Sequence, residues 1–489
     1  MKLKKLNATT FREPFQAPLK VVQFGEGNFL RAFATWIIDV MNEKKVFNGK
    51  TVIVQPLEKG MSELINSQDG LYHVFCRGYR QGKYVEDVRL IKSVEKCVNP
   101  YANFQEYLEL ASIESLDIVV SDTTEAGIQT NEFDNLEDAP ASTFPGKLTQ
   151  LMYARYRHFN GAIDKGYTIL PCESIDKNAD RLKTAVIKYA ELWDLGADFI
   201  YWINAANSFH NTLADRIAPG FPHEDAETCK RMTGYDDQLM VVAEHFHRWV
   251  IEGGDKLEEK LPLGKSGLNV TLVDDLTPYR ERKVKVLDAT HTAMCPVSAL
   301  YGNSAVRDAM EDSFTNMFIE DLLYGEILPT LDIDDSEKRR CAAETLERLK
   351  NPGVDHLLSG IAMNSISRFK VRNLPTLVDY VEMYHALPQN LVFALSAMIV
   401  FYKGEFNRKP TPVNDDPAIV SFFKGAWKNR SYLDVARAVL ANDELWDMDL
   451  TRIEGLTDAV ARYIEAIDKY GIEEGYTSLF CLEDYMELI

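Results

Sequence analysis

The stretch that decides the fold is LKVVQFGEGNFLRAF, residues 19–33. Its first six residues form a short apolar run with β-branched side chains, which indicates a buried strand. Gly25 and Gly27 follow at once, and over residues 28–42 the apolar side chains recur at helical spacing. A strand, a glycine turn and a helix in this order bring backbone N–H groups to a place where a pyrophosphate can bind. The usual fingerprint has a third glycine where this chain has Leu30, so the pattern alone leaves a dinucleotide site and a purely steric turn both open.

The sequence that follows alternates between strand and helix patterns as far as residue 273. Strands are expected at residues 51–55, 116–121, 167–171 and 268–273, and helices at 144–159, at 178–195 and from Asn207 onward. Residues 70–93 alternate and contain glycine turns, which is typical of an inserted hairpin. Repeated strand–helix units predict an α/β domain, a Rossmann-like doubly wound sheet over residues 1–277.

The acid that binds the adenosine ribose in such domains is not cleanly placed in this chain. Gln55 ends the second expected strand, and Glu58 is the nearest carboxylate. The residues alone therefore do not distinguish NAD from NADP.

Residues 278–489 change character, because helical patterns dominate and strand patterns nearly disappear. Prolines punctuate the expected helices, and no repeat of constant period is evident. A C-terminal, mostly α-helical domain is therefore expected. A cleft between two such domains, at the carboxyl ends of the strands, is where a ligand is expected to bind.

A lysine, an aspartate and a histidine stand near the start of this second half, in PYRERKVKVLDATHTAMCPVSALYG, residues 278–302. On a regular helix Lys283, Asp288 and His291 would lie at roughly 0°, 140° and 80° around the axis, and a modest distortion would bring them closer. A lysine drawn into a dry site has its neutral form favoured, which would let it accept a proton. The alternative is a basic surface turn followed by a capped helix.

Composition narrows the class of protein. The 489 residues favour two or three domains, and the net charge of −20 argues against a nucleic-acid partner. No run of about 18 apolar residues occurs, so no membrane span is expected. The seven cysteines are scattered without a CxxC pair, which favours reduced thiols, a cytoplasmic location and no metal. The first 15 residues lack the apolar core of a secretory signal, which also favours the cytoplasm.

Two motifs resemble those of the mannitol dehydrogenase family, the polyol-specific long-chain dehydrogenases. GEGNFLRAF at residues 25–33 resembles the family's GxGxFxRA, and Lys283, Asp288 and His291 resemble its K-x4-N-x2-H. Further phrases resemble a branch of the family that acts on sugar acids: SQDGLY at 67–72, TTEAGI at 123–128, FPGKLTQL at 144–151, PYRERKV at 278–284 and NSISRFKVR at 364–372. The resemblance extends from about residue 20 to at least residue 400.

The resemblance implies an NAD-dependent, metal-free oxidoreductase with a small sugar-acid substrate, and it implies roles for particular residues. Lys283 would be the general base and His291 would orient the substrate oxygen. Residues expected to bind the substrate, with structural or surface roles as alternatives, are Asn178, Asn207, Asp215, Lys370 and Arg372. Residues expected to bind the cofactor are Gly25, Gly27, Asn28, Phe29 and Thr124.

Asp288 departs from the family motif, which has asparagine at this position. An asparagine donates a hydrogen bond to an oxygen that becomes an alkoxide, whereas an ionised aspartate only accepts hydrogen bonds. Losing one such donor costs about 3–4 kcal/mol. Three outcomes follow: Asp288 is held protonated, Asn178 or Asn207 donates instead, or the protein is a catalytically weak relative that binds the cofactor.

Overall fold

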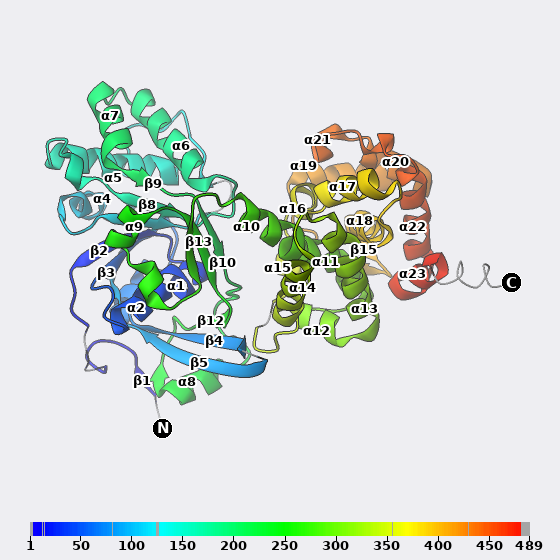
Figure 1. The fold of residues 1–489 in the computed structure, drawn as a ribbon, viewed down its shortest axis with the longest axis horizontal. Coiled ribbons are helices and arrows are strands. Elements are labelled where there is room, and N and C mark those ends of the chain that lie inside the picture. Colours follow the sequence, from blue (N-terminus) through cyan, green and yellow to red (C-terminus); the bar gives the residue numbers. More distant parts are fainter. Residues whose placement is uncertain are drawn as a thin grey trace. The chain divides into compact units, whose positions relative to one another are not determined.

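The computed structural model describes residues 3–11, 13, 15–80, 82–123, 127–354, 356–428 and 430–480. The chain divides into two compact units, Met1–Tyr279 and Arg280–Ile489 (Figure 1). The first unit is built on strands with helices around them, and the second is almost entirely helical.

A six-stranded parallel sheet forms the centre of the first unit, in the order β6-β3-β2-β7-β8-β9. The bounds are β2 Leu19–Phe24, β3 Lys50–Val54, β6 Val94–Val98, β7 Ile118–Ser121, β8 Thr168–Pro171 and β9 Ser208–Phe209. The chain runs outward in one direction from β2 to β6 and then in the other from β7 to β9. The order therefore reverses between β2 and β7, which confirms the predicted Rossmann-like doubly wound sheet.

Helices cover both faces of this sheet because successive side chains of each strand point to opposite faces. Val21 and Ile53 pack on the side of α1 (Asn28–Ala32) and α2 (Ala34–Glu43). Val22 and Val52 pack on the other side. The helices of that side are α4 Phe104–Glu109, α5 Phe144–His158, α6 Asn178–Leu192 and α7 Ala197–Ala206. Both faces are dry, which explains why the strands read as continuous apolar runs.

Smaller sheets complete the first unit. The predicted hairpin is present as β4 Tyr72–Arg80 and β5 Lys83–Ile91, with β12 Val241–Glu244 parallel to β4. A second small sheet joins β10 Thr212–Asp215, β13 Arg248–Glu252 and β14 Val270–Val273. The remaining elements are β1 Lys4–Lys5, β11 Tyr235–Asp236, α3 Ser62–Ser67, α8 Ala226–Thr233 and α9 Asp255–Lys260.

The helix predicted from Asn207 onward is wrong, because helix α7 ends at Ala206 and strands follow. The Asn207 amide donates to the carbonyls of Trp202 and Ile203, at 3.1 and 3.4 Å, and accepts from the Tyr167 N–H at 2.8 Å. These bonds terminate α7 and attach its end to the sheet. The polar residues after Ala206 are therefore a helix stop and not a helix start.

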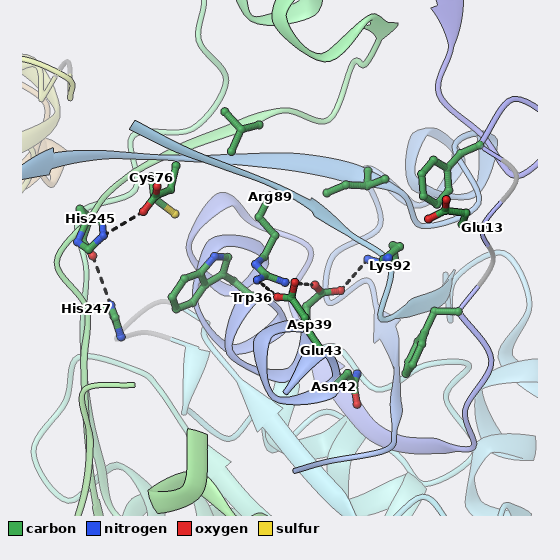
Figure 2. Close-up of a pocket in the computed structure, with 15 residues that line it drawn as sticks. Glu13, Trp36, Asp39, Asn42, Glu43, Cys76, Arg89, Lys92, His245 and His247 are labelled. Atoms are coloured by element: carbon green, nitrogen blue, oxygen red, sulfur yellow. Dashed lines mark hydrogen bonds and ion pairs between the residues drawn. The ribbon is translucent and has the colours of Figure 1, made fainter. Parts of the chain in front are cut away.

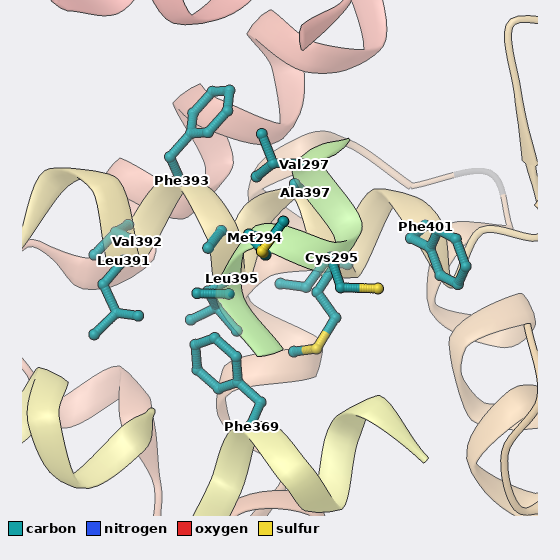
Figure 3. Packing of buried hydrophobic residues seen from close by; sticks show 14 of the residues in the cluster. Met294, Cys295, Val297, Phe369, Leu391, Val392, Phe393, Leu395, Ala397 and Phe401 are labelled. Carbon is teal, nitrogen blue, oxygen red and sulfur yellow. The ribbon is translucent and has the colours of Figure 1, made fainter. Parts of the chain in front are cut away.

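Helix α18, Gln389–Phe401, is buried almost throughout and forms the centre of the second unit. Figure 3 shows Leu391, Val392, Phe393 and Leu395 of α18 beside Met294, Cys295 and Val297 of α11, Ala289–Tyr301. The other helices are α10 Thr277–Arg282 at the division, α12 Val306–Glu311, α13 Ser313–Asp321, α14 Asp335–Leu349, α15 Leu358–Ile361, α16 Ser365–Arg372, α17 Leu374–Tyr384, α19 Pro417–Trp427, α20 Tyr432–Leu440, α21 Asp443–Trp446, α22 Leu456–Tyr470 and α23 Ile472–Phe480. Two short strands, β15 Glu405–Phe406 and β16 Lys409–Pro410, are also present. The predicted mostly helical second half is confirmed.

Within the described part of the chain, no helix is both long enough and apolar enough to span a bilayer.

Candidate active site

Lys283 and Asp288 meet because the helix between α10 and α11 is a π-helix over Lys283–Asp288. In a π-helix the backbone hydrogen bond runs from residue i to residue i+5, so side chains five apart lie above one another. The Lys283 ammonium nitrogen is 3.4 Å from Asp288 Oδ2, and both side chains are largely buried. The distortion anticipated at the start of the helix is therefore a complete π-helical turn.

Threonine hydroxyls and a neighbouring helix junction stabilise this turn. Thr290 Oγ1 donates to the Val286 carbonyl at 2.6 Å, and Thr292 Oγ1 donates to the Asp288 carbonyl at 2.8 Å. The Asn373 amide donates to the Ala289 carbonyl at 2.9 Å. Irregular backbone is stable in a protein interior when side chains pair its polar groups in this way.

His291 lies one turn beyond Asp288 and is buried in the first turn of α11. Its imidazole ring is 5.1 Å from the ring of His356, in an edge-to-face arrangement. Burial and the nearby Arg348 and Arg368 lower the pKa of His356 to about 4. His356 is therefore uncharged at neutral pH, and His291 faces a neutral imidazole rather than a cation.

The two basic residues predicted to bind a carboxylate have different surroundings. Arg372 is half-buried, and its Nη1 donates to Thr292 Oγ1 at 3.2 Å, so it contacts α11 one turn beyond Asp288. Lys370 instead pairs with the exposed Asp447 at 3.0 Å. An ion pair of this kind is what a surface role for Lys370, the alternative to substrate binding, predicts.

The glycine turn in the first unit has the backbone geometry that a dinucleotide requires. Gly25 adopts φ +119°, which side chains rarely tolerate, and a Cβ there would lie 3.2 Å from the Asp122 carbonyl oxygen. Gly27 is exposed and a Cβ there would meet nothing within 4 Å, so the backbone beside it is open to a ligand. Gly27 also precedes the first residue of α1, Asn28. These observations fit a pyrophosphate at the turn.

Asn28 and Phe29 are partly buried, and each contacts another side chain of the first unit. Asn28 Oδ1 accepts from the Arg31 guanidinium at 2.8 Å, and the Phe29 ring stacks on Phe33 at 5.0 Å. Arg31 also donates to the Glu26 carbonyl at 3.0 Å and to the Leu239 carbonyl at 2.5 Å. The side chain of Arg31 thus fixes the turn from behind, a role that the bare sequence pattern did not reveal. Thr124 lies outside the described residues.

The loop after β3 is held by Gln55, the residue that stands where a ribose-binding acid was sought. The Gln55 amide donates to the carbonyls of Leu57 and Glu58 at 2.8 and 3.0 Å, and it accepts from the Ser62 N–H at 3.1 Å. Glu26 is attached to the same loop through the Met61 N–H, and burial raises the pKa of the Glu26 carboxyl. Glu58 itself is exposed.

The polar residues predicted to bind substrate from the first unit serve its structure. Asn178 is fully buried, and its amide donates to the carbonyls of Pro171, Glu173 and Thr212, each at 3.0 Å. Its oxygen accepts from the N–H groups of Ala179 and Thr212. Asn207 is occupied at the end of α7, as described above. In this structure both amides are therefore engaged with backbone groups of the first unit.

Asp215 is buried at the end of β10, where it stands opposite Arg248 of β13 in the register of the sheet. The next residue, Arg216, is also buried and donates to the carbonyls of Glu244 and Ala32, at 2.9 and 2.5 Å.

A cavity of about 660 Å³ in the first unit has none of the predicted site residues in its lining. In this cavity Arg89 pairs with Asp39 at 2.9 Å (Figure 2). His247 accepts from the Asn269 N–H, and burial and Arg216 lower its pKa to about 4. Among the described residues, no group of three or more His, Cys, Asp or Glu side chains is arranged to hold a metal.

A doubly wound parallel sheet with an open glycine turn defines the class of the first unit: it is a dinucleotide-binding domain of the Rossmann type. Residues 19–265 match the mannitol dehydrogenase Rossmann domain, and residues 275–468 match the mannitol dehydrogenase C-terminal domain. The chain belongs to the mannitol dehydrogenase family.

Relatives match over the full length of the chain. The altronate oxidoreductase of Bacillus subtilis (strain 168) is 43% identical over 483 residues, which cover 98% of this chain and 99% of the relative. The altronate oxidoreductase of Shigella flexneri is 41% identical over 483 residues, which cover 98% of this chain and 100% of the relative.

Two solved structures show the same fold. The mannitol 2-dehydrogenase of Pseudomonas fluorescens, in a ternary complex with NAD and D-mannitol, has a TM-score of 0.78 and 20% identity, covering 98% of this chain and 100% of the other. A substrate-free D-sorbitol dehydrogenase has a TM-score of 0.76 and 24% identity, covering 97% and 100%.

Proposed function

We propose that this protein is a tagaturonate reductase (altronate oxidoreductase) that interconverts D-altronate and D-tagaturonate, with Lys283 as the proton carrier. The observation that supports this most is the 43% identity to an altronate oxidoreductase over nearly the whole of both chains. At the broader level, the protein is an NAD-dependent oxidoreductase that acts on the hydroxyl group of a sugar acid. The six described cysteines are all free thiols, as is usual in a reducing compartment. We therefore propose that the protein is located in the cytoplasm.

Bound NAD would supply the hydride acceptor, and the open backbone at Gly27 and the positive φ of Gly25 fit its pyrophosphate. The residues of this chain would handle the proton and the substrate. The neutral amine of Lys283 would accept the hydroxyl proton when altronate is oxidised, and its ammonium form would return that proton to the oxygen when tagaturonate is reduced. His291, on the same helix, would orient that oxygen.

Arg372 is the residue we propose to bind the substrate carboxylate. It is half-buried, and it contacts Thr292, whose hydroxyl donates to the Asp288 carbonyl at 2.8 Å. A guanidinium can bind a carboxylate with two parallel hydrogen bonds, which gives orientation as well as attraction. Because the chain has a net charge of −20, an anionic substrate needs such a local cation.

Asp288 supports a second candidate, a relative that binds NAD and turns over slowly. Its carboxylate is 3.4 Å from the Lys283 nitrogen and pairs with the ammonium form. An ionised carboxylate also repels an alkoxide, and it cannot donate the hydrogen bond that an asparagine would. Within the active class, a fructuronate reductase (D-mannonate oxidoreductase) or a polyol dehydrogenase is the nearest rival.

The test is the oxidation of NADH with D-tagaturonate, D-fructuronate and D-fructose under identical conditions. We expect the highest kcat/KM with D-tagaturonate. Binding of NADH without turnover of any of the three would support the slow relative instead, and a preference for one of the other two would support the corresponding rival.

Replacing the lysine tests its role directly. Lys283→Ala should lower kcat with D-tagaturonate by about a hundredfold or more, because it removes the proton carrier. Lys285→Ala is the matched control: Lys285 lies on the same turn but pairs with Asp379 at 2.9 Å. Comparable losses in both variants would count against Lys283 as the proton carrier.

A further inference from the structure

Glu173 is a buried carboxylate that the proposed chemistry does not use. It stands two residues beyond the end of β8 and is 1% exposed. One carboxylate oxygen accepts from the Thr123 N–H at 3.0 Å and from the Thr123 hydroxyl at 3.1 Å. The other oxygen accepts from the Ser121 hydroxyl at 3.1 Å. Glu173 therefore ties the carboxyl end of β8 to the carboxyl end of β7.

This position lies in the half of the sheet that receives the second nucleotide. In a doubly wound dinucleotide fold, the first half carries the glycine turn and binds the adenosine side, and the other half binds the remaining nucleotide at the carboxyl ends of its strands. Here β2, β3 and β6 make the first half, and β7, β8 and β9 make the second. Ser121 is the last residue of β7, and Thr123 and Glu173 follow strands of the second half, on the nicotinamide side.

Burying the Glu173 carboxylate costs free energy, and the hydrogen bonds that it accepts offset that cost. Burial raises the pKa of Glu173, while the bonds from Thr123 and Ser121 act in the opposite direction. The backbone at Glu173 is fixed in turn, because the Asn178 amide donates to its carbonyl at 3.0 Å. Without the carboxylate, the Thr123 N–H would lose its partner, and an unpaired buried donor favours rearrangement of the segment that carries it.

We propose that Glu173 is a positioning residue for the nicotinamide half of NAD, acting through Thr123 and Ser121. The proposal rests on the proposed function only in taking NAD as the cofactor. Glu173 does not touch the reacting atoms; it keeps the ends of β7 and β8 in the one arrangement that accepts the ring. If that arrangement is populated only in part, the apparent affinity for the whole dinucleotide falls by the same fraction.

The test compares NADH with ADP-ribose, which lacks the nicotinamide, in titrations of the full chain. In Glu173→Met both acceptor oxygens are removed while the length of the side chain is kept. We expect the Kd for NADH to rise about tenfold and the Kd for ADP-ribose to stay within about twofold of wild type. Glu244→Met is the matched control: Glu244 is 1% exposed on β12 and accepts from the Ile217 N–H at 2.6 Å. The control should leave the ratio of the two Kd values unchanged.

Equal weakening of NADH and ADP-ribose, or no weakening of either, would overturn the proposal. If Glu173→Met does not fold, Ser121→Ala and Thr123→Val each remove one hydroxyl donor, and an unchanged Kd ratio in both would overturn the proposal as well. The result of this titration does not depend on whether the proposed function is correct. Wild-type protein that binds NADH but turns over no sugar acid would defeat the proposed function and leave this ratio to be measured as before.

Discussion

Asp288 is the residue at which this chain departs from the family motif, and its surroundings predict the effect of restoring asparagine. Asp288→Asn should raise kcat with D-tagaturonate by about tenfold or more, because the amide can donate to the substrate oxygen and no longer pairs with the Lys283 ammonium. Steady-state rates at saturating NADH measure the effect.

The control for Asp288→Asn is Asp379→Asn. Asp379 forms a similar ion pair, with Lys285 at 2.9 Å, but is not part of the lysine, aspartate and histidine trio. Its variant should leave kcat within about twofold, as expected for a partly exposed ion pair. An unchanged or lower rate in Asp288→Asn would mean that another group already stabilises the alkoxide.

The elements show which parts of the fold and of the site the sequence could predict. Four strands of the main sheet, β2, β3, β7 and β8, were recognisable because both faces are buried, so their residues are mostly apolar. The strands β6, β9, β10, β12 and β13 were missed; β10, for example, lies among polar residues, in HNTLADR at 210–216. The trio at 283–291 was found from its spacing, but the π-helical turn depends on hydrogen bonds from Thr292 and Asn373, which spacing alone does not reveal. Glu173 could have been noticed, since it is an acid immediately beyond a buried strand.

Helix α18 is the element whose stability should depend on pH. Its N-terminal N–H groups at Asn390 and Leu391 donate to the buried carboxylate of Glu326, each at 2.7 Å. Burial raises the pKa of Glu326 to about 7. Because the folded state holds this proton more tightly than the unfolded state does, the stabilisation is complete below about pH 4.5 and is lost as pH rises to about 7. The loss amounts to roughly 3 kcal/mol in the free energy of unfolding.

Glu326→Gln should therefore flatten the dependence of the unfolding free energy on pH between pH 5 and pH 8. Urea denaturation of the variant and of wild type at pH 5 and pH 8 gives the change in unfolding free energy for each protein. The contributions of other buried carboxyl groups cancel when the two changes are compared. Glu320→Gln is the control, because Glu320 is partly exposed and pairs with Lys350 at 3.1 Å. Equal slopes in wild type and Glu326→Gln would show that Glu326 does not titrate in this range.

At the scale of the whole molecule, each compact unit has hydrophobic clusters of its own. The two main clusters of Met1–Tyr279 cover the two faces of the sheet, and the cluster of Arg280–Ile489 is centred on α18. A unit of this size can bury enough apolar surface to fold alone. The elements expected to bind adenosine and pyrophosphate, from the glycine turn to the loop held by Gln55, all lie in the first unit.

Residues 1–279 expressed alone should consequently fold and bind ADP-ribose, with a Kd within about tenfold of that of the full chain. Circular dichroism during thermal unfolding and calorimetric titration measure the two properties. The same fragment carrying Gly25→Val should lose ADP-ribose binding, because valine cannot adopt φ +119° and its Cβ would crowd the Asp122 carbonyl. A wild-type fragment that unfolds cooperatively but does not bind ADP-ribose, while the full chain does, would show that the second unit supplies part of the adenosine site.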